Sequence, residues 1–314
     1  MRDVYIIGLS LAAGTTLFSW ALLGILLKYY RGFFPLDHPN KRSMHEQPIP
    51  RGGGIVIAGL FILGSIFFIP TWPGIDRFLL ALVVGTLVIC TLGWLDDQKS
   101  LNNLTKLTVQ LIIGVICVAL MQPETKIYLF TGTMVNLASI ILIPSLVLWI
   151  TWIINVFNFM DGVDGLVASQ AIINAFVLSI WFFCSGDNNI ALVCLILGGA
   201  TSGVIFFNWA PAKIFLGDSG SLSLGFIFGV LAIYGVTKYK MPVSGFIVLY
   251  GVFLADTGIT LLRRILKRER WWEPHNQHFY QRIVRNGVSH SKMSIIVVIA
   301  NSGLAVLATL QVVS

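Results

Sequence analysis

Long apolar stretches alternate with short polar segments along almost the whole chain. Each stretch holds about 17–25 residues, the length that an α-helix needs to cross a bilayer. They predict an all-α polytopic membrane protein with about ten transmembrane helices, folded as a single integral membrane domain over residues 1–314. The stretches cover residues 4–27, 52–70, 76–95, 105–121, 139–157, 166–184, 190–207, 221–237, 242–262 and 293–313.

Two shorter features modify this pattern. Residues 126–137 have two β-prone halves around Thr131-Gly132, which predicts a small hairpin between two helices. The first apolar stretch has no Ala-x-Ala cleavage site and is too long for the core of a signal peptide, so we expect it to be retained.

Composition excludes an ordinary soluble protein. The chain is 56% hydrophobic and 11% charged, against about 25% charged residues in soluble domains, and its mean hydropathy is +0.83. The cysteines at 90, 117, 184 and 194 all lie inside apolar stretches and form no Cys-x-x-Cys pair. We therefore expect neither a disulfide nor a zinc site.

The basic residues are unevenly distributed among the loops. Sixteen of the 21 Lys and Arg residues fall on one side of the predicted topology. The positive-inside rule makes this side cytoplasmic and places both termini outside. Because the charge is divided among short loops beside membrane ends, it does not suggest a nucleic-acid partner. The loops on this side span 28–51, 96–106, 158–166, 208–220 and 263–292, and all of them except 158–166 contain Lys or Arg.

A polar segment begins at Asn155, directly after the apolar run 140–154. Asn155, Asn158 and Asp161 come at intervals of three residues, so a helix would direct them toward one face. Asp164 follows, and intervening glycines let the chain bend there. Carboxylates at the end of a membrane helix indicate a functional site. The same residues are also typical of a turn that caps two helices, and both interpretations stay open at this point.

Two further acidic segments follow other apolar stretches. Asp96 and Asp97 end the third stretch, and segment 207–221 after the seventh contains Lys213 and Asp218. An aspartate at a helix C-terminus opposes the helix dipole, so a separate interaction is needed to favour one there. All three acidic segments fall on the basic side of the topology. This convergence predicts one cytoplasmic active-site cleft.

The first cytoplasmic loop ends in Arg51 followed by the glycines 52–54, which open the second stretch. Free N–H groups at a helix start beside an arginine predict a phosphate or carboxylate site. Contact of the basic loop with anionic lipid headgroups explains the same pattern.

The last cytoplasmic loop, 263–292, is basic and aromatic. His275 and His278 lie three residues apart and Arg282 four further on, so one side of a helix or turn would carry all three as donors to phosphate oxygens. An interfacial helix anchored by arginine and tryptophan is the alternative. Asp256, late in the ninth stretch, either lines the cytoplasmic cavity or hydrogen-bonds to another helix.

The polar segments contain four motifs: Leu95-Asp96-Asp97; Asn155-x-x-Asn158-x-x-Asp161-Gly162-x-Asp164-Gly165-Leu166; Asn208-x-x-Pro211-Ala212-Lys213-Ile214-Phe215-x-Gly217-Asp218-x-Gly220-Ser221; and His275-x-x-His278. Together they resemble the polyprenyl-phosphate N-acetylhexosamine-1-phosphate transferases. This membrane family includes the phospho-N-acetylmuramoyl-pentapeptide transferase and the initiating transferases of O-antigen, enterobacterial common antigen and teichoic acid linkage units. The resemblance covers nearly the whole chain, and the two longer motifs are highly specific.

The histidine segment differs from the His-His run of the muropeptide enzyme and looks more like the O-antigen-initiating branch. The resemblance therefore implies transfer of N-acetylhexosamine-1-phosphate from a UDP-sugar to undecaprenyl phosphate, with release of UMP, to initiate a cell-envelope glycan such as O-antigen. It also implies a bacterial inner-membrane enzyme that requires Mg²⁺, with Mn²⁺ as the alternative ion.

The same resemblance implies residue roles. Asp218 corresponds to the metal-binding aspartate, with Asp161 beside it, because Mg²⁺ uses one or two carboxylates together with substrate phosphates. The phosphate nucleophile has a second pKa of about 6, so positioning and charge neutralisation should matter more than a base. The expected catalytic residues are Asp96, Asp97, Asp161 and Asp164. The expected substrate-binding residues are Asn155, Asn158, Lys213, Arg51, His275, His278 and Arg282.

Other classes of membrane protein fit less well. A secondary transporter would carry acidic ion-coupling residues at the bilayer midplane, whereas these cluster at one face. A CDP-alcohol phosphotransferase would need Asp-Gly-x-x-Ala-Arg, but Asp161-Gly162 is followed by Val163-Asp164-Gly165. The expected partners are a UDP-N-acetylhexosamine, undecaprenyl phosphate and the lipid bilayer. A homodimer is compatible with the sequence, which specifies neither the oligomeric state nor the sugar.

Overall fold

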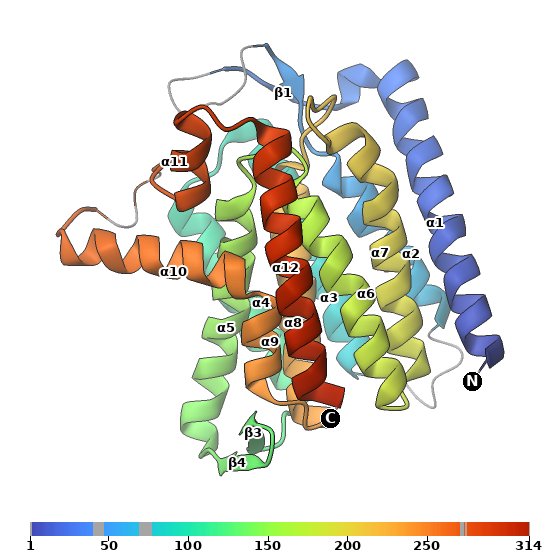
Figure 1. The fold of residues 1–314 in the computed structure, drawn as a ribbon, viewed down its shortest axis with the longest axis vertical. Coiled ribbons are helices and arrows are strands. Elements are labelled where there is room, and N and C mark those ends of the chain that lie inside the picture. Colours follow the sequence, from blue (N-terminus) through green and yellow to red (C-terminus); the bar gives the residue numbers. More distant parts are fainter. Residues whose placement is uncertain (1, 40–46, 69–76, 271–272, 274, 314) are drawn as a thin grey trace.

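The computed structural model describes residues 2–39, 47–68, 77–270, 273 and 275–313, which form a bundle of helices (Figure 1). Two short antiparallel hairpins and a 3-10 turn, η1, accompany the helices. The elements in chain order are α1 (Arg2–Tyr29), η1 (Arg31–Phe33), β1 (Leu36–Asp37), β2 (Ile49–Pro50), α2 (Gly54–Phe68), α3 (Arg77–Lys99), α4 (Asn103–Met121), β3 (Lys126–Phe130), β4 (Thr133–Asn136), α5 (Ser139–Met160), α6 (Leu166–Cys184), α7 (Asn188–Asn208), α8 (Gly217–Lys238), α9 (Val243–Leu249), α10 (Gly251–Leu266), α11 (Phe279–Arg285) and α12 (His290–Val313).

Eight of the described helices are long and apolar enough to cross a membrane, which confirms the predicted all-α polytopic class. The bent pair α9 and α10 adds a ninth span if it is taken as one, and α2 is apolar but shorter. The described part of the chain therefore gives eight or nine spans where the hydropathy pattern predicted ten. The external position of both termini depends on that number and stays a prediction.

The predicted stretch 242–262 is not one straight helix. α9 ends at Leu249, α10 begins at Gly251, and the two helices are bent by 83° relative to each other. A Cβ at Gly251 would lie 3.0 Å from Leu304 Cδ1, so the glycine leaves room for α12 beside the break. Hydropathy sums apolar residues over a window and carries no information on direction, which is why the bend was not predicted. In Figure 1, α10 leaves the bundle sideways.

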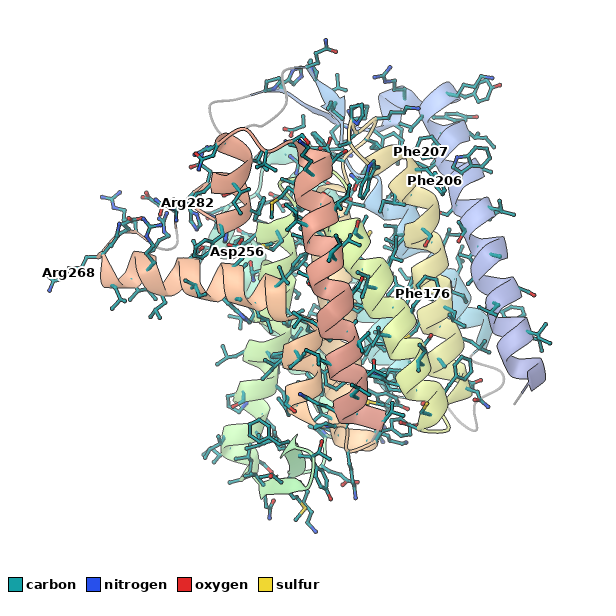
Figure 2. All side chains as sticks on the ribbon, viewed as in Figure 1. Phe176, Phe206, Phe207, Asp256, Arg268 and Arg282 are labelled. Carbon is teal, nitrogen blue, oxygen red and sulfur yellow. The ribbon has the colours of Figure 1, made fainter. Side chains whose placement is uncertain are left out.

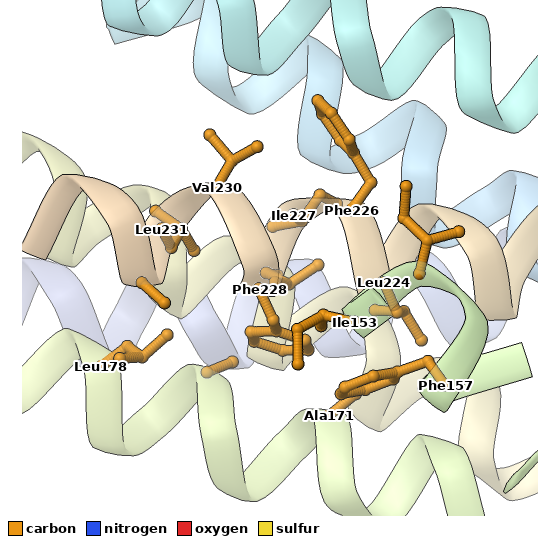
Figure 3. Packing of buried hydrophobic residues seen from close by; sticks show 14 of the residues in the cluster. Ile153, Phe157, Ala171, Leu178, Leu224, Phe226, Ile227, Phe228, Val230 and Leu231 are labelled. Atoms are coloured by element: carbon orange, nitrogen blue, oxygen red, sulfur yellow. The ribbon is translucent and has the colours of Figure 1, made fainter. Parts of the chain in front are cut away.

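Helix α8 lies inside the bundle and is buried from Ser219 to Thr237. It packs against α2, α3 and α5, and Figure 3 shows Phe226, Phe228 and their apolar neighbours around it. Glycines allow the closest approaches. A Cβ at Gly225 would lie 2.7 Å from the Ile153 carbonyl oxygen, and one at Gly85 would collide with the Phe226 ring. Close packing at small residues is a main source of helix association in membranes.

The hairpin predicted over 126–137 is confirmed. Strands β3 and β4 pair antiparallel, and Gly132 in their turn has a φ of +77°, a backbone conformation that favours glycine. β1 and β2 also pair antiparallel and bring together the two sides of the first polar loop.

The bundle has two chemically distinct ends. Figure 1 shows that α1 begins and α12 ends at the same end, where the β3–β4 hairpin also lies. β1 and α11 lie at the opposite end, to which the basic loops belong. This arrangement agrees with the grouping of loops that the charge distribution predicted.

We expect the end with the basic loops to face the cytoplasm. In a Cys184→Ser background, Ser289→Cys in intact cells should resist an impermeant thiol reagent, whereas Thr133→Cys in β4 should react. The native side chains at 133 and 289 are both exposed, so membrane sidedness and not burial decides the result. Equal labelling of the two variants would show that the predicted topology is wrong.

Candidate active site

Asp97 connects the end of α3 to the start of α8. Its side chain is fully buried. Asp97 Oδ1 accepts a hydrogen bond from the Asp218 amide at 2.8 Å, and Oδ2 accepts one from the Ser219 amide at 3.1 Å. The first N–H groups of a helix have no partner within that helix, so the carboxylate caps α8 and complements its dipole. This cap is the separate interaction that an aspartate at the end of α3 needed.

Arg51 is the charged partner of Asp97. Arg51 Nε donates to Asp97 Oδ1 at 2.8 Å, and Arg51 Nη2 lies 3.4 Å from Asp218 Oδ1. Burial disfavours the guanidinium charge, but Asp97 and Asp218 outweigh it, so the pKa of Arg51 is raised. A permanently charged group therefore bridges the cap and the Asp218 carboxylate.

The glycines after Arg51 do not form the predicted anion site. The amides of Gly52 and Gly53 donate to the Phe215 carbonyl at 3.1 and 2.9 Å, and the Gly54 amide donates to the Leu216 carbonyl at 2.9 Å. These N–H groups are already occupied, so that part of the prediction is wrong. The glycines serve packing instead, because a Cβ at Gly54 would collide with the backbone of Gly220 in α8.

The Asp218 carboxylate lies among side chains from several elements. Asn158 Nδ2 donates to Asp218 Oδ1 at 3.1 Å, and Lys106 Nζ lies 3.5 Å from Oδ2. The Asp218 side chain is 17% exposed, so it remains open to small ligands. A Cβ at Gly93 would collide with the Asp218 backbone, which shows how closely α3 approaches this turn.

Asp96 holds the lysine of this cluster. Lys106 Nζ donates to Asp96 Oδ2 at 2.7 Å, and the Leu101 amide donates to Asp96 Oδ1. The sequence did not identify Lys106 as a site residue. It belongs to the same short basic loop as the aspartate pair, and that position was the available signal.

The polar residues at the end of α5 diverge. Asn158 faces Asp218, whereas Asn155 Nδ2 donates to Gln110 Oε1 of α4 at 2.7 Å, so the regular spacing did not bring all three together. Asp161 caps the end of α5 and is partly exposed, with no hydrogen bond or ion pair of its carboxylate found within the described ranges. Burial and the charges of Asp218 and Asp97 raise its pKa.

Asp164 connects two distant segments. The Ala212 amide donates to Asp164 Oδ2 at 3.0 Å, and His290 Nδ1 lies 3.1 Å from Asp164 Oδ1. The Ser294 hydroxyl donates to the Asp164 carbonyl at 2.7 Å. This geometry holds the loop before α8 against the start of α12, and the predicted catalytic role of Asp164 stays a prediction.

Lys213 lies exposed on the loop between α7 and α8. Its backbone amide donates to the Phe207 carbonyl at 2.7 Å, which fixes the loop rather than the ammonium group. Its contact with a substrate phosphate stays a prediction.

The histidine segment is organised by Asp256. His278 Nδ1 lies 3.0 Å from Asp256 Oδ1, and the amides of Phe279 and Tyr280 donate to the two Asp256 oxygens at 3.0 Å each. The carboxylate of α10 therefore caps α11, which decides the open question about Asp256 in favour of a contact between helices. His278 is buried, with its ring centroid 4.9 Å from that of His275.

His275 is partly exposed and uncharged at neutral pH. Burial, together with His278 and Arg264, lowers the pKa of His275 to about 4. The two rings lie side by side as predicted, but they differ in environment. His275 is the more accessible of the pair.

Arg282 lies on α11 and, with Arg263 and Arg285, lines a cleft of about 280 Å³. Its guanidinium carbon lies 5.8 Å from the centroid of the Phe279 ring. Figure 2 shows Asp256 where α10 leaves the bundle, near α11 and Arg282, whereas Arg268 lies far out along α10. Within the described residues of segment 263–292, α10 ends, α11 follows and α12 begins at His290, so the segment is not one interfacial helix. The anchoring role of Trp271 and Trp272 lies outside the described residues.

Helix α11 connects the two clusters of polar residues. The Tyr280 hydroxyl donates to the Phe159 carbonyl at 2.8 Å, and the His278 ring stacks on the Phe159 ring with centroids 5.9 Å apart. A Cβ at Gly162 would collide with the Tyr280 hydroxyl. The histidine segment therefore packs on the same turn that carries Asp161.

The donor set fits a hard divalent cation shared with a substrate. Asp218 is partly open, and Asp161 has a carboxylate without a protein partner in the described part of the chain. No group of three or more His, Cys, Asp or Glu side chains that could hold a metal occurs among the described residues. Mg²⁺ keeps several waters and binds through one or two carboxylates plus phosphates, so this set suits Mg²⁺ better than a structural metal.

A sequence profile of glycosyl transferase family 4 matches residues 79–236. The chain is 31% identical over 283 residues to a probable undecaprenyl-phosphate N-acetylglucosaminyl 1-phosphate transferase of Bacillus subtilis (strain 168), covering 84% of this chain and 73% of that protein. It is 26% identical over 327 residues to a decaprenyl-phosphate N-acetylglucosaminephosphotransferase of Mycobacterium leprae (strain TN), covering 95% and 81%. It is 31% identical over 223 residues to a phospho-N-acetylmuramoyl-pentapeptide-transferase of Wolbachia pipientis wMel, covering 67% of each.

Fold and site thus define a multi-pass membrane protein with a charged site at one end of its bundle. The chain belongs to glycosyl transferase family 4, and the predicted resemblance to the polyprenyl-phosphate N-acetylhexosamine-1-phosphate transferases is confirmed.

We expect the cap made by Asp97 to be essential for stability. Asp97→Ala leaves the α8 amides without their acceptor and the partly buried Arg51 with only its longer contact to Asp218, and breaking a buried charged pair costs up to about 3–5 kcal/mol. Asp97→Asn keeps one acceptor oxygen, so it should lose clearly less stability than Asp97→Ala. Thermal unfolding in detergent measures both, and equal melting temperatures of Asp97→Ala and the wild type would contradict the capping role.

Proposed function

We propose that this protein transfers N-acetylhexosamine-1-phosphate from a UDP-sugar to undecaprenyl phosphate, with release of UMP. An oxygen of the lipid phosphate forms a bond to the β-phosphorus of the UDP-sugar. The bond from that phosphorus to the oxygen bridging it to the α-phosphate breaks, and UMP leaves with the electron pair. N-acetylglucosamine is the first sugar to test, because two of the relatives above are named for it.

One observation supports this reaction most strongly. Asp218 lies between two cations, with Arg51 Nη2 3.4 Å from its Oδ1 and Lys106 Nζ 3.5 Å from its Oδ2. A diphosphate needs cationic groups and a metal-binding carboxylate at short range, and this cluster offers both. The acidic residues lie at helix ends, which disfavours the alternative of a secondary transporter with a midplane site.

Asp218 and Asp161 would hold the Mg²⁺ ion. When bound, the ion would neutralise phosphate charge and orient the diphosphate. Burial and then the charges of Asp218 and Asp97 raise the pKa of Asp161, and a bound cation would relieve the repulsion between these carboxylates.

Charge neutralisation by protein groups supports the remaining chemistry. The lipid phosphate has a second pKa of about 6, so at neutral pH it is mostly dianionic and needs no base. Lys106 and Arg51 can orient phosphate oxygens and stabilise the charge that develops on them. Asp96 holds Lys106 at 2.7 Å and so positions that ammonium group. In this account Asp96 and Asp97 arrange cations and helices and do not remove a proton.

The same proposal covers the glycan pathway and the side of the membrane that the active site faces. The histidine segment, similar to the O-antigen-initiating branch, supports a role at the start of a cell-envelope glycan such as O-antigen. The excess of basic residues near the site supports an active site facing the cytoplasm of a bacterial inner membrane.

Asp218→Asn should abolish turnover without unfolding the protein. The substitution removes one charge from the proposed metal site, and changes even beyond the direct ligands typically cost about 10- to 100-fold. UMP release by the purified protein with UDP-N-acetylglucosamine and undecaprenyl phosphate measures the effect. Glu124→Gln, exposed at the other end of the molecule, is the control. Near-wild-type turnover of Asp218→Asn would exclude the metal-binding role.

The turnover rates of the alanine variants at His275 and His278 should show whether these residues act in catalysis or only anchor the segment. A lost charge-assisted hydrogen bond costs about 1.5–3 kcal/mol, or about 10- to 150-fold in rate if it forms in the transition state. We expect His278→Ala to show such a loss while membrane insertion stays normal. Turnover within about twofold of wild type in both alanine variants would leave the segment with an anchoring role only.

A further inference from the structure

Three buried amide side chains lie in the middle of the bundle, away from the charged site. Gln170 and Asn174 belong to α6, Asn301 belongs to α12, and each is at most 1% exposed. Uncharged but strongly polar groups are costly at this depth unless they are hydrogen-bonded. Neither the family motifs nor the proposed reaction uses them.

The amides lie beside the break between α9 and α10. Gln170 Nε2 donates to the Leu249 carbonyl at 3.2 Å, and Leu249 is the last residue of α9. A Cβ on Gly251, the first residue of α10, would lie 3.0 Å from Leu304 Cδ1 of α12, so α12 passes close to the break. Asn301 lies about one turn before Leu304 on α12, which places it at the level of the break.

The register of α6 and α12 brings Asn301 to the level of the other two amides. The Ser294 hydroxyl contacts the Asp164 carbonyl near one end of the pair, and Trp181 Nε1 contacts the Thr309 hydroxyl near the other. Asn301 lies midway between the α12 contacts, and Gln170 and Asn174 lie midway between those of α6. All three side chains face the interior of the bundle.

The amide cluster of Gln170, Asn174 and Asn301 has more hydrogen-bonding atoms than it has protein partners for them. Gln170 Nε2 also donates to Asn174 Oδ1 at 2.6 Å. Gln170 Oε1, Asn174 Nδ2 and both polar atoms of Asn301 have no partner among the described residues. Two acceptors and two donors therefore remain, and exchanging the O and N atoms of any amide keeps both kinds present.

The break between α9 and α10 adds further backbone groups that need hydrogen-bond partners at the same place. The end of α9 leaves carbonyl groups, and the start of α10 leaves N–H groups, without partners inside their own helices. In a membrane such backbone groups are satisfied by neighbouring side chains or ordered water. Gln170 satisfies one of them directly through the Leu249 carbonyl.

We propose that Gln170, Asn174 and Asn301 bind ordered water at the α9–α10 break, and that this hydrated cluster holds α10 in its sideways direction. Water matches the set because it both donates and accepts, whereas a cation would leave the amide N–H groups unsatisfied. The direction of α10 matters to the charged site, because Asp256 on α10 caps α11 and contacts His278. This water site does not depend on which substrate the protein uses.

Whether Asn301→Leu raises or lowers the melting temperature tests whether the three amides bind water. If the amides were dry and unpaired, Asn301→Leu would remove a buried penalty and raise the melting temperature. If they bind water, the leucine expels it and strands Gln170 and Asn174, so the melting temperature in detergent should fall by about 3–6 °C. Asn301→Ser keeps a polar group and leaves room for water, so it should fall less. Ser302→Leu, on the exposed face of α12, is the control.

A second measurement tests the hold on α10. Spin labels at Leu266→Cys and Leu307→Cys, both exposed native positions, report the distance between α10 and α12 in a Cys184→Ser background. Gln170→Leu should broaden or shift this distance distribution, and Ser302→Leu should not. A rise in melting temperature for Asn301→Leu, or an unchanged distribution for Gln170→Leu, would overturn the proposal.

Discussion

The buried carboxylate of Asp97 is the interaction on which the charged site depends. A fully buried charge persists only where donors satisfy it, and here the donors are two amides of α8 and the guanidinium of Arg51. These donors come from two distant parts of the chain, so one carboxylate of α3 fixes the loop before α2 and the first turn of α8 together. Asp218 lies in that first turn, and its position follows from the cap.

Close packing of α8 holds Asp97 and Asp218 in place. The histidine segment, in contrast, is held by a less regular part of the fold. α8 is buried from Ser219 to Thr237, with glycines of α2 and α3 in direct contact with its first turns. The histidine segment instead reaches the site through α10, which is bent by 83° relative to α9, and through Asp256 of α10, whose carboxylate caps the start of α11. The position of His278 therefore depends on how the break in the ninth apolar stretch is stabilised, whereas the position of Asp218 does not.

Patterns in the sequence predicted the features that depend on local composition. The apolar stretches, the hairpin around Gly132 and the convergence of the acidic segments at one end all follow from hydropathy, turn residues and charge. Features that depend on direction or on distant pairing were missed. The bend before Gly251 is invisible to hydropathy, and Asn155 turns to Gln110 because α4 happens to pass there. Lys106 pairs with Asp96, and His290 with Asp164, only once the helices have packed together.

Binding of Mn²⁺, followed by the paramagnetic resonance signal of the free ion, tests the central claim most directly. The claim is that the capped start of α8 presents Asp218 to a metal ion shared with the substrate diphosphate. With UDP-N-acetylglucosamine present, the wild type and Glu124→Gln should deplete the free-ion signal equally. Asp218→Asn should bind the ion at least about tenfold more weakly, since it loses a charged ligand. Equal affinity of Asp218→Asn and the wild type would contradict the account.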